Sequence, residues 1–156
     1  LRECLEVKKT ALGEAHPSTL DSVHNLANVV QERGRFEEAE GLHCQCLNAR
    51  KTALGDTHPS TLASMSSLAL TVKKQGRYGE AEELLRQCLE AEKSVLGEAH
   101  PDTLTSISNL AAAVFKQGRY GEAEELFCQC LEVRKSALGE AHPSALASIN
   151  NLALAV

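Results

Sequence analysis

The residues of this chain best suited to chemistry are six cysteines and six histidines among its 156 residues. Thiolates and imidazoles bind metal ions, and cysteine also carries redox chemistry. Four of the histidines precede a proline, and four of the cysteines form two Cys-x-Cys pairs. These are His16, His58, His100 and His142, with the pairs Cys44–Cys46 and Cys128–Cys130. Whether such groups can act together depends on the elements that position them.

A period of 42 residues runs through the whole chain. It relates the four His-Pro pairs, and residues 55–96 and 97–138 are identical at 28 of 42 positions. Such self-similarity is typical of a repeat array. We predict one repeat domain over 1–156, in which both ends cut through a helix, so we expect a segment of a longer array. Its parts are 1–12, the end of a preceding repeat; the full repeats 13–54, 55–96 and 97–138; and 139–156, the start of a following one.

Each repeat is predicted to form two antiparallel helices. In 59–96, Pro59 suits the first helical position, and Gly76 suits the end of the first helix. Between them, apolar residues recur with the helical period at Leu62, Met65, Leu68, Ala69 and Val72. A second apolar run continues to Gly97, and no stretch alternates with period two. The predicted fold is therefore all-α without strands: an α-solenoid of stacked helix pairs with a concave and a convex surface.

The cysteines are predicted to be structural. Cys4, Cys46, Cys88 and Cys130 fall on the core-facing stripe of the second helix, where cysteine packs as a small apolar residue. Equivalent positions lie about 10 Å apart, beyond the roughly 7 Å that a disulfide spans. Cys44 and Cys128 point away from the core and should be accessible. We expect no metal site, and thiols in this number indicate a reducing, cytoplasmic compartment.

The histidines divide into three groups. Each His-Pro histidine directly precedes a predicted helix and should cap it through its neutral ring. His43 takes a place that is Leu85 and Phe127 in the other repeats, which indicates a core histidine held by a neighbour. His24 lies off the apolar stripe of its helix, and either ligand contact or a solvated polar position fits it.

Composition and motifs exclude several classes of protein. With 16 Lys+Arg against 21 Asp+Glu, the net charge of −5 opposes nucleic-acid binding. The apolar runs are far shorter than the roughly 20 residues of a membrane span. The glutamate clusters at 37–40, 80–83 and 122–125 are expected to be solvated. No nucleophile beside a base, phosphate loop or His-Glu-x-x-His motif is present, so we predict neither catalysis nor a cofactor.

The second repeat matches a known signature. Leu68-Ala69, Val72, Gly76, Tyr78, Ala81, Leu84-Leu85 and Cys88 have its spacing. With the 42-residue length and the Leu-Gly-x-x-His-Pro join, the chain resembles tetratricopeptide repeats of the kinesin-light-chain type. The resemblance implies a superhelix whose first helices line a concave groove. Departures are valines at positions 30, 72 and 114 in place of the family's aromatic residue, and Ser67 in place of asparagine.

The polar face of the first helices supplies the candidate ligand-binding residues. The resemblance implies that an asparagine at position 25, 109 or 151 hydrogen-bonds the backbone of a bound peptide. The alternative is an asparagine that bonds its own helix or a neighbouring loop. The candidates are His24, Asn25, Asn28, Ser66, Ser67, Lys73, Ser108, Asn109, Lys116, Asn150 and Asn151.

Three functions follow from these patterns. The first is a non-enzymatic scaffold that binds a peptide segment of a partner protein in the groove. The second is a structural spacer or self-assembling array, a homo-oligomer with contacts through 1–12 and 145–156. The third is a metal carrier or enzyme that uses cysteine and histidine, and the spread of these residues along the repeats disfavours it. No nucleic-acid or membrane partner is expected.

Overall fold

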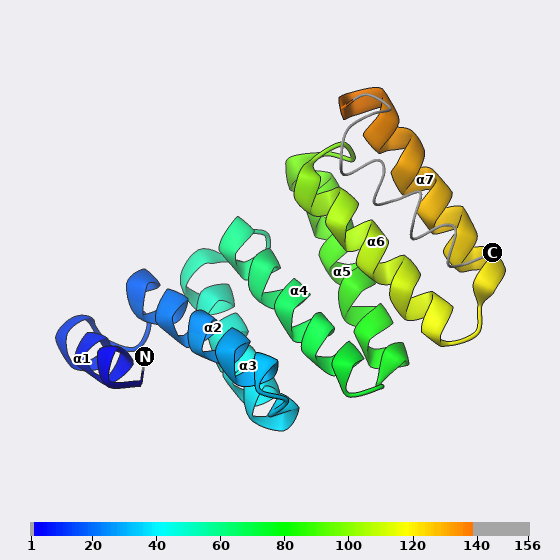
Figure 1. The fold of residues 1–156 in the computed structure, drawn as a ribbon. Coiled ribbons are helices and arrows are strands. Elements are labelled where there is room, and N and C mark those ends of the chain that lie inside the picture. The colour runs from blue at the N-terminus through cyan, green and yellow to red at the C-terminus, as the bar shows by residue number, and fades with distance from the viewer. Residues whose placement is uncertain (1, 139–156) are drawn as a thin grey trace. The chain divides into compact units, whose positions relative to one another are not determined.

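The computed structural model describes residues 2–138, which are helical apart from short turns and contain no strand. This confirms the all-α class for that range (Figure 1). Turns of three residues alternate with turns of four, and this alternation recurs every 42 residues. The helices are α1 (Arg2–Leu12), α2 (Pro17–Glu32), α3 (Phe36–Leu54), α4 (Pro59–Lys74), α5 (Tyr78–Leu96), α6 (Pro101–Lys116) and α7 (Tyr120–Leu138).

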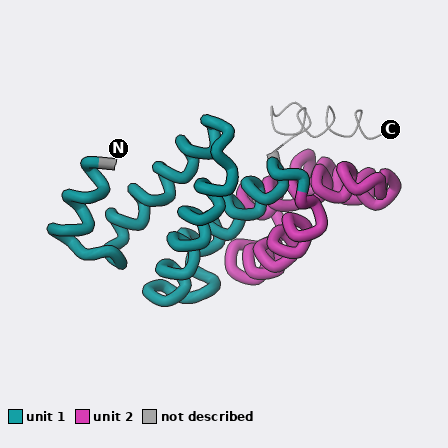
Figure 2. The backbone as a smooth tube through the Cα atoms, turned by 90° about the horizontal axis from the view of Figure 1, so that it is seen from below, with its two compact units in different colours: residues 1–76 teal, residues 77–156 magenta. Residues whose placement is uncertain are grey.

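The chain divides into two compact units, residues 1–76 and residues 77–156 (Figure 2). In the first unit, α2 packs against α1 and α3, α3 packs against α4, and α2 also touches α4. In the second unit, α6 packs between α5 and α7. The helix pairs predicted for repeats 13–54 and 97–138 are thus formed, as α2–α3 in the first unit and α6–α7 in the second.

Local sequence sets where the first helix of each repeat begins and ends. Proline occupies the first turn of α2, α4 and α6, where its missing N–H is not needed. Gly34, Gly76 and Gly118 follow the ends of these helices with φ of 76°, 79° and 80°. This left-handed conformation suits glycine and turns the chain toward the next helix, as predicted at Gly76.

The core of each unit is formed by the predicted apolar stripes. All five stripe residues of α4, from Leu62 to Val72, are buried. In the first unit a cluster joins α1, α2 and α3, and in the second unit apolar side chains of α5, α6 and α7 are buried. The first cluster consists of Leu5, Leu20, Val23, Leu26, Val30, Ala39 and Cys46. The second unit buries Leu85, Leu104, Leu110, Val114 and Phe127.

No helix within residues 2–138 combines the length and the apolar character that a membrane crossing requires.

Candidate functional site

The His-Pro histidines are helix caps. The Nδ1 atoms of His16, His58 and His100 each accept a hydrogen bond from the backbone N–H two residues later, at 3.2, 3.1 and 3.2 Å. Each ring thereby satisfies one of the free donors at the start of α2, α4 or α6. This confirms the capping role at three of the four positions, and His142 lies outside the described residues.

The cysteines of the second helices pack into the core, with one exception. Cys46, Cys88 and Cys130 are fully buried, as predicted. The Cys46 and Cys130 thiols donate to the carbonyl oxygens of Leu20 and Leu104, at 3.4 and 3.3 Å. The prediction for Cys4 is wrong, because this thiol is exposed. Within the described residues α1 packs mainly on α2, and the face of α1 that carries Cys4 is not covered.

The remaining thiols do not form a metal centre with other groups. Cys44 and Cys128 are partly exposed, and none of the six cysteines, all of them in the described range, forms a disulfide. Over residues 2–138, no three side chains of His, Cys, Asp or Glu gather closely enough to hold a metal ion.

The first unit places several predicted ligand-binding residues on adjoining helices. Asn25 on α2 is exposed, and Asn28 is half-buried. Ser66 and Ser67 on α4 are half-buried as well. Contacts between α2 and α4 bring these two helices together within the unit.

Two polar contacts join the C-terminal ends of α2 and α4. The Thr71 hydroxyl donates to the Gln31 side-chain oxygen at 2.5 Å, and Lys74 pairs with Glu32 at 3.0 Å. Lys73 is half-buried beside this pair, and burial lowers the pKa of its ammonium, with a smaller effect from the charge of Lys74. The end of the face is therefore positively charged but partly desolvated.

The candidates of the second unit divide between surface and interior. Asn109 is half-buried and Lys116 is exposed. Ser108 turns toward α7: its hydroxyl donates to the Leu104 carbonyl at 3.0 Å and lies 3.3 Å from the Cys130 thiol. Its hydroxyl thus serves packing within the unit. Asn150 and Asn151 lie outside the described residues.

His24 also turns inward. Its ring meets the ring of His43 edge-on, with the centroids 5.5 Å apart. His43 is fully buried, as predicted for a core histidine, but no hydrogen bond holds either of its ring nitrogens. The contact with His24 takes the place of the expected polar neighbour.

A set of buried polar links is not evident from the sequence analysis. Arg50 donates to the Ser60 carbonyl at 2.9 Å and to the Ser64 hydroxyl at 2.8 Å, and it pairs with Asp21. Forty-two residues earlier, Lys8 makes the corresponding bonds to Ser18 and Ser22. The available signal is a polar residue that repeats at positions 8, 50 and 92 opposite a serine 14 residues later.

The glutamate clusters are not wholly solvated. Glu82 is buried and accepts hydrogen bonds from Gln117 and Arg119, both at 2.7 Å, and from Arg86. In the first unit, Glu40 accepts a bond from Gln75 at 2.7 Å. Each link joins the N-terminal part of the second helix of one repeat to the turn after the first helix of the next repeat. Sequence periodicity alone does not reveal these links.

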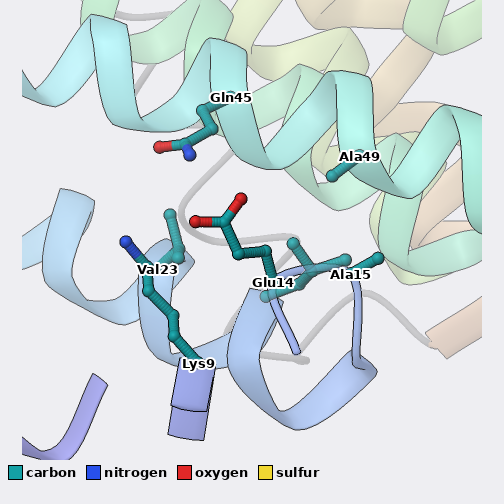
Figure 3. Close-up of a pocket in the computed structure, with 7 residues that line it drawn as sticks. Lys9, Glu14, Ala15, Val23, Gln45 and Ala49 are labelled. Atoms are coloured by element: carbon teal, nitrogen blue, oxygen red, sulfur yellow. The ribbon is translucent and has the colours of Figure 1, made fainter. Parts of the chain in front are cut away.

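A small pocket of about 240 Å³ opens among α1, α2 and α3, away from the predicted sites. Leu20, Val23 and Ala49 give it apolar walls, and Lys9, Glu14 and Gln45 bring polar groups to it (Figure 3). The positions of Val23 and Ala49 are taken by the larger Ile107 and Val133 in the third repeat. The pocket has room for about one side chain, far less than a peptide segment.

Comparison with known proteins identifies the family of the chain. A tetratricopeptide repeat family model matches residues 24–94, 74–136 and 102–156. Together these ranges span most of the sequence, so the chain belongs to the tetratricopeptide repeat family. A search of curated proteins gives no match.

Solved structures narrow the repeat type. Two crystal structures of nearly identical TPR-like repeats, attributed to a kinesin light chain of Podosopora anserina, are similar to the chain, and one of them is of a point variant. The variant has 35% identity and a TM-score of 0.86, and the other has 36% and 0.84. Each alignment covers 99% of this chain and 73% of the other. BtubC (BKLC) from P. vanneervenii, with 22% identity and a TM-score of 0.79, shares the fold over 99% of this chain and 60% of its own.

Proposed function

We propose that this chain is a non-enzymatic protein-interaction module that binds a peptide segment of a partner protein through its first helices. Its family generally mediates protein–protein interaction, which supports the class. The finer proposal concerns the polar face of α2 and α4 in the first unit, with Asn109 and Lys116 of α6 as a further patch in the second. The six thiols, none of them in a disulfide, favour a reducing, cytoplasmic setting.

The observation that carries the proposal is the exposed side chain of Asn25 on α2, a helix that touches α4. Asn28, Ser66 and Ser67 are partly accessible on the same pair of touching helices. A carboxamide offers a donor and an acceptor together, which matches the N–H and C=O of an extended peptide. Lys73 and Lys74 would favour an acidic residue of the ligand at the far end of the face.

A random-peptide display selection tests this function with three variants beside the unchanged protein. Asn25→Ala and Asn109→Ala each remove one candidate amide. Asn48→Ala is the matched control, because Asn48 is an exposed asparagine on α3, a helix that carries none of the candidate residues. Circular dichroism at neutral pH establishes that all four proteins are folded before selection.

We expect a peptide motif that is enriched on the unchanged protein and on Asn48→Ala, and that is lost or weakened about tenfold on Asn25→Ala. Loss of one to two hydrogen bonds of a bound backbone corresponds to that factor. A motif that is indifferent to both Asn25→Ala and Asn109→Ala, or no motif on any folded variant, would contradict the proposal.

A second candidate, the self-assembling array, has one observation in its favour. Val7 of α1 is 67% exposed and Leu12 is 47% exposed, on a helix whose main packing partner within the described residues is α2. Exposed apolar helix faces favour association. Light scattering that gives the monomer mass at every concentration up to the highest that the protein tolerates would contradict it. Residues 145–156, the other predicted contact, lie outside the described residues.

A further inference from the structure

Two imidazole rings lie against each other inside the first helix pair. His24 extends from α2 and His43 from α3, with ring planes inclined by 67° and centroids 5.5 Å apart. His43 has no exposed surface. Neither ring nitrogen of His43 has a hydrogen-bond partner, and the buried Nδ1 of His24 has none. Three buried polar atoms are thus unsatisfied at one place, where each would ordinarily be paired.

Packing does not require histidine at these two positions. The later repeats carry Ser66 and Ser108 in place of His24, and Leu85 and Phe127 in place of His43. Leu85 and Phe127 are both buried. An apolar side chain therefore fills the same place in the same frame without unsatisfied polar atoms. The imidazole pair therefore distinguishes the α2–α3 pair from the α6–α7 pair.

Burial and the nearest positive charge oppose protonation at the pair, and one nearby carboxylate favours it. Arg50 of α3 lowers the pKa of His24, whereas Asp21 of α2 raises it and is paired with Arg50 at 2.5 Å. Burial is the largest cause of the lowered pKa of His24. Burial, followed by the charge of His24, lowers the pKa of His43 to about 4. Both rings are therefore neutral at pH 7.

Other charged groups of the adjoining helices are already engaged. From α1, Lys8 donates to Ser22 on α2. On α3, one turn before His43, Glu40 accepts a bond from Gln75. From α4, Lys74 pairs with Glu32, two turns beyond His24 on α2. None of these contacts supplies a carboxylate to the rings.

We propose that the His24–His43 pair is an acid-sensitive joint, at which protonation of either imidazole opens the α2–α3 helix pair while the α6–α7 pair remains closed. An added proton on His43 creates a fully buried cation without a hydrogen-bond acceptor, next to a second imidazole. An added proton on His24 places a charge near Arg50 and against the ring of His43. Separating α2 from α3 returns both rings to water. The α6–α7 pair has Ser108 and Phe127 at these positions and lacks the joint.

The direction of the pH effect follows from proton linkage. Unfolded histidine has a pKa near 6.5, so below that pH the open state binds protons that the closed state excludes. The stability of the α2–α3 pair is therefore complete above pH 6.5 and falls as the pH drops toward 4. For His43 alone, the linkage predicts a loss of roughly tenfold or more in the closed-to-open ratio at pH 5.

Amide hydrogen exchange at pH 7 and pH 5, corrected for intrinsic rates and read by mass spectrometry, tests this joint. The comparison variant is His24→Ser with His43→Leu, the residues that the second repeat itself carries. In the unchanged protein we expect protection of α2 and α3 to fall about tenfold or more at pH 5. In the variant, and in α6 and α7 of both proteins, the change should stay below about twofold.

The capping histidines provide an internal reference, because His16 and His100 cap α2 and α6 in the same way, so the two helix pairs have this feature in common. Equal loss of protection in α2–α3 and α6–α7, or equal loss in the variant, would overturn the proposal. If the variant does not fold, an NMR titration of the unchanged protein decides. A His43 ring that titrates at or above pH 6.5 overturns the joint, and one that stays neutral to below pH 5 supports it.

Discussion

Arg50 in the first unit and Glu92 in the second occupy the same repeat position with opposite charges. Both are almost fully buried, at 5% and 3% exposure. Each interacts with the equivalent serine on the first helix of the next repeat, Ser64 for Arg50 and Ser106 for Glu92. Arg50 has several acceptors, including Asp21, whereas one carboxylate oxygen of Glu92 is buried without a hydrogen bond. The repeat frame therefore fixes the place of a buried polar residue, and the neighbours decide how well it is satisfied.

The electrostatic consequence differs between the two units. Burial raises the pKa of the Glu92 carboxyl, while hydrogen bonds from Ser106 and from Cys88 lower it. Asp21, the partner of Arg50, corresponds to Ala63 in the next repeat, so the acidic partner is absent where the basic residue is absent. A buried charge with its partners stabilises a packing arrangement, whereas one without them destabilises it.

Replacing Arg50 should have the largest effect. Arg50→Ala removes the donor to Ser60, Ser64 and Asp21, and leaves the Ser64 hydroxyl buried with fewer partners. We expect a loss of about 3 kcal/mol in the free energy of unfolding of the first unit, measured by urea denaturation. Asp21→Asn is the control and should lose less than about 1 kcal/mol, because Asp21 is 64% exposed. Equal losses in the two variants would show that Arg50 acts only as a surface charge.

Glu92→Gln should have a smaller and opposite effect. Glutamine keeps the shape of the side chain and removes the buried carboxylate, so at pH 7 we expect a gain of about 1 kcal/mol in unfolding free energy. Because the folded pKa of Glu92 is raised, the wild-type carboxyl supports stability below the unfolded pKa and loses that contribution as pH rises. The difference in unfolding free energy between Glu92→Gln and the unchanged protein should therefore disappear as the pH falls to about 4.

The control for this change is Glu90→Gln on the exposed side of α5. It removes one charge without relieving burial and should move stability by less than about 0.5 kcal/mol. An equal gain in unfolding free energy in both variants would contradict the proposed cost of burying the Glu92 carboxylate. So would a stability difference for Glu92→Gln that persists at acidic pH.

The reactivity of Cys4 in the first unit and of Cys88 in the second gives a further comparison that needs no mutation. Burial, and then the charge of Glu92, raises the pKa of Cys88 to about 12, so its thiolate is scarce at mildly alkaline pH. Cys4 is exposed. We expect iodoacetamide to alkylate Cys4 at least about a hundredfold faster than Cys88 in the native protein, as peptide mapping by mass spectrometry would show. In denaturant the two rates should converge, and comparable rates in the native state would refute the burial of Cys88.

Local chemistry explains why some residues can be assigned from the sequence. A cap depends on the residues directly beside it, so the roles of His16, His58 and His100 are predictable from the His-Pro pairs. The burial of Cys46 follows from the helical period. Cys4 shares that period yet is exposed, because burial also requires a neighbouring helix to cover it.

Contacts between distant residues explain where prediction stops. Basic residues near the end of a second helix suit the helix dipole, and Arg50 fits that pattern, yet its principal partners come from α2 and α4. Glu82 belongs to a cluster expected to be solvated, and Gln117 and Arg119, far along the chain, enclose it. His24 fits a ligand-facing or solvated position by sequence, and it turns toward the ring of His43.

The sequence by itself determined the helices, their limits and the pairing of neighbours, because proline, glycine, histidine caps and apolar periods act within a few residues. Tertiary structure alone decided which polar groups are buried together and which are satisfied. Arg50, Glu92 and the His24–His43 pair have the sequence context of ordinary helix residues. Their energetics depend on whether the adjoining helix presents a carboxylate, a hydroxyl or another imidazole, and helix packing sets that choice.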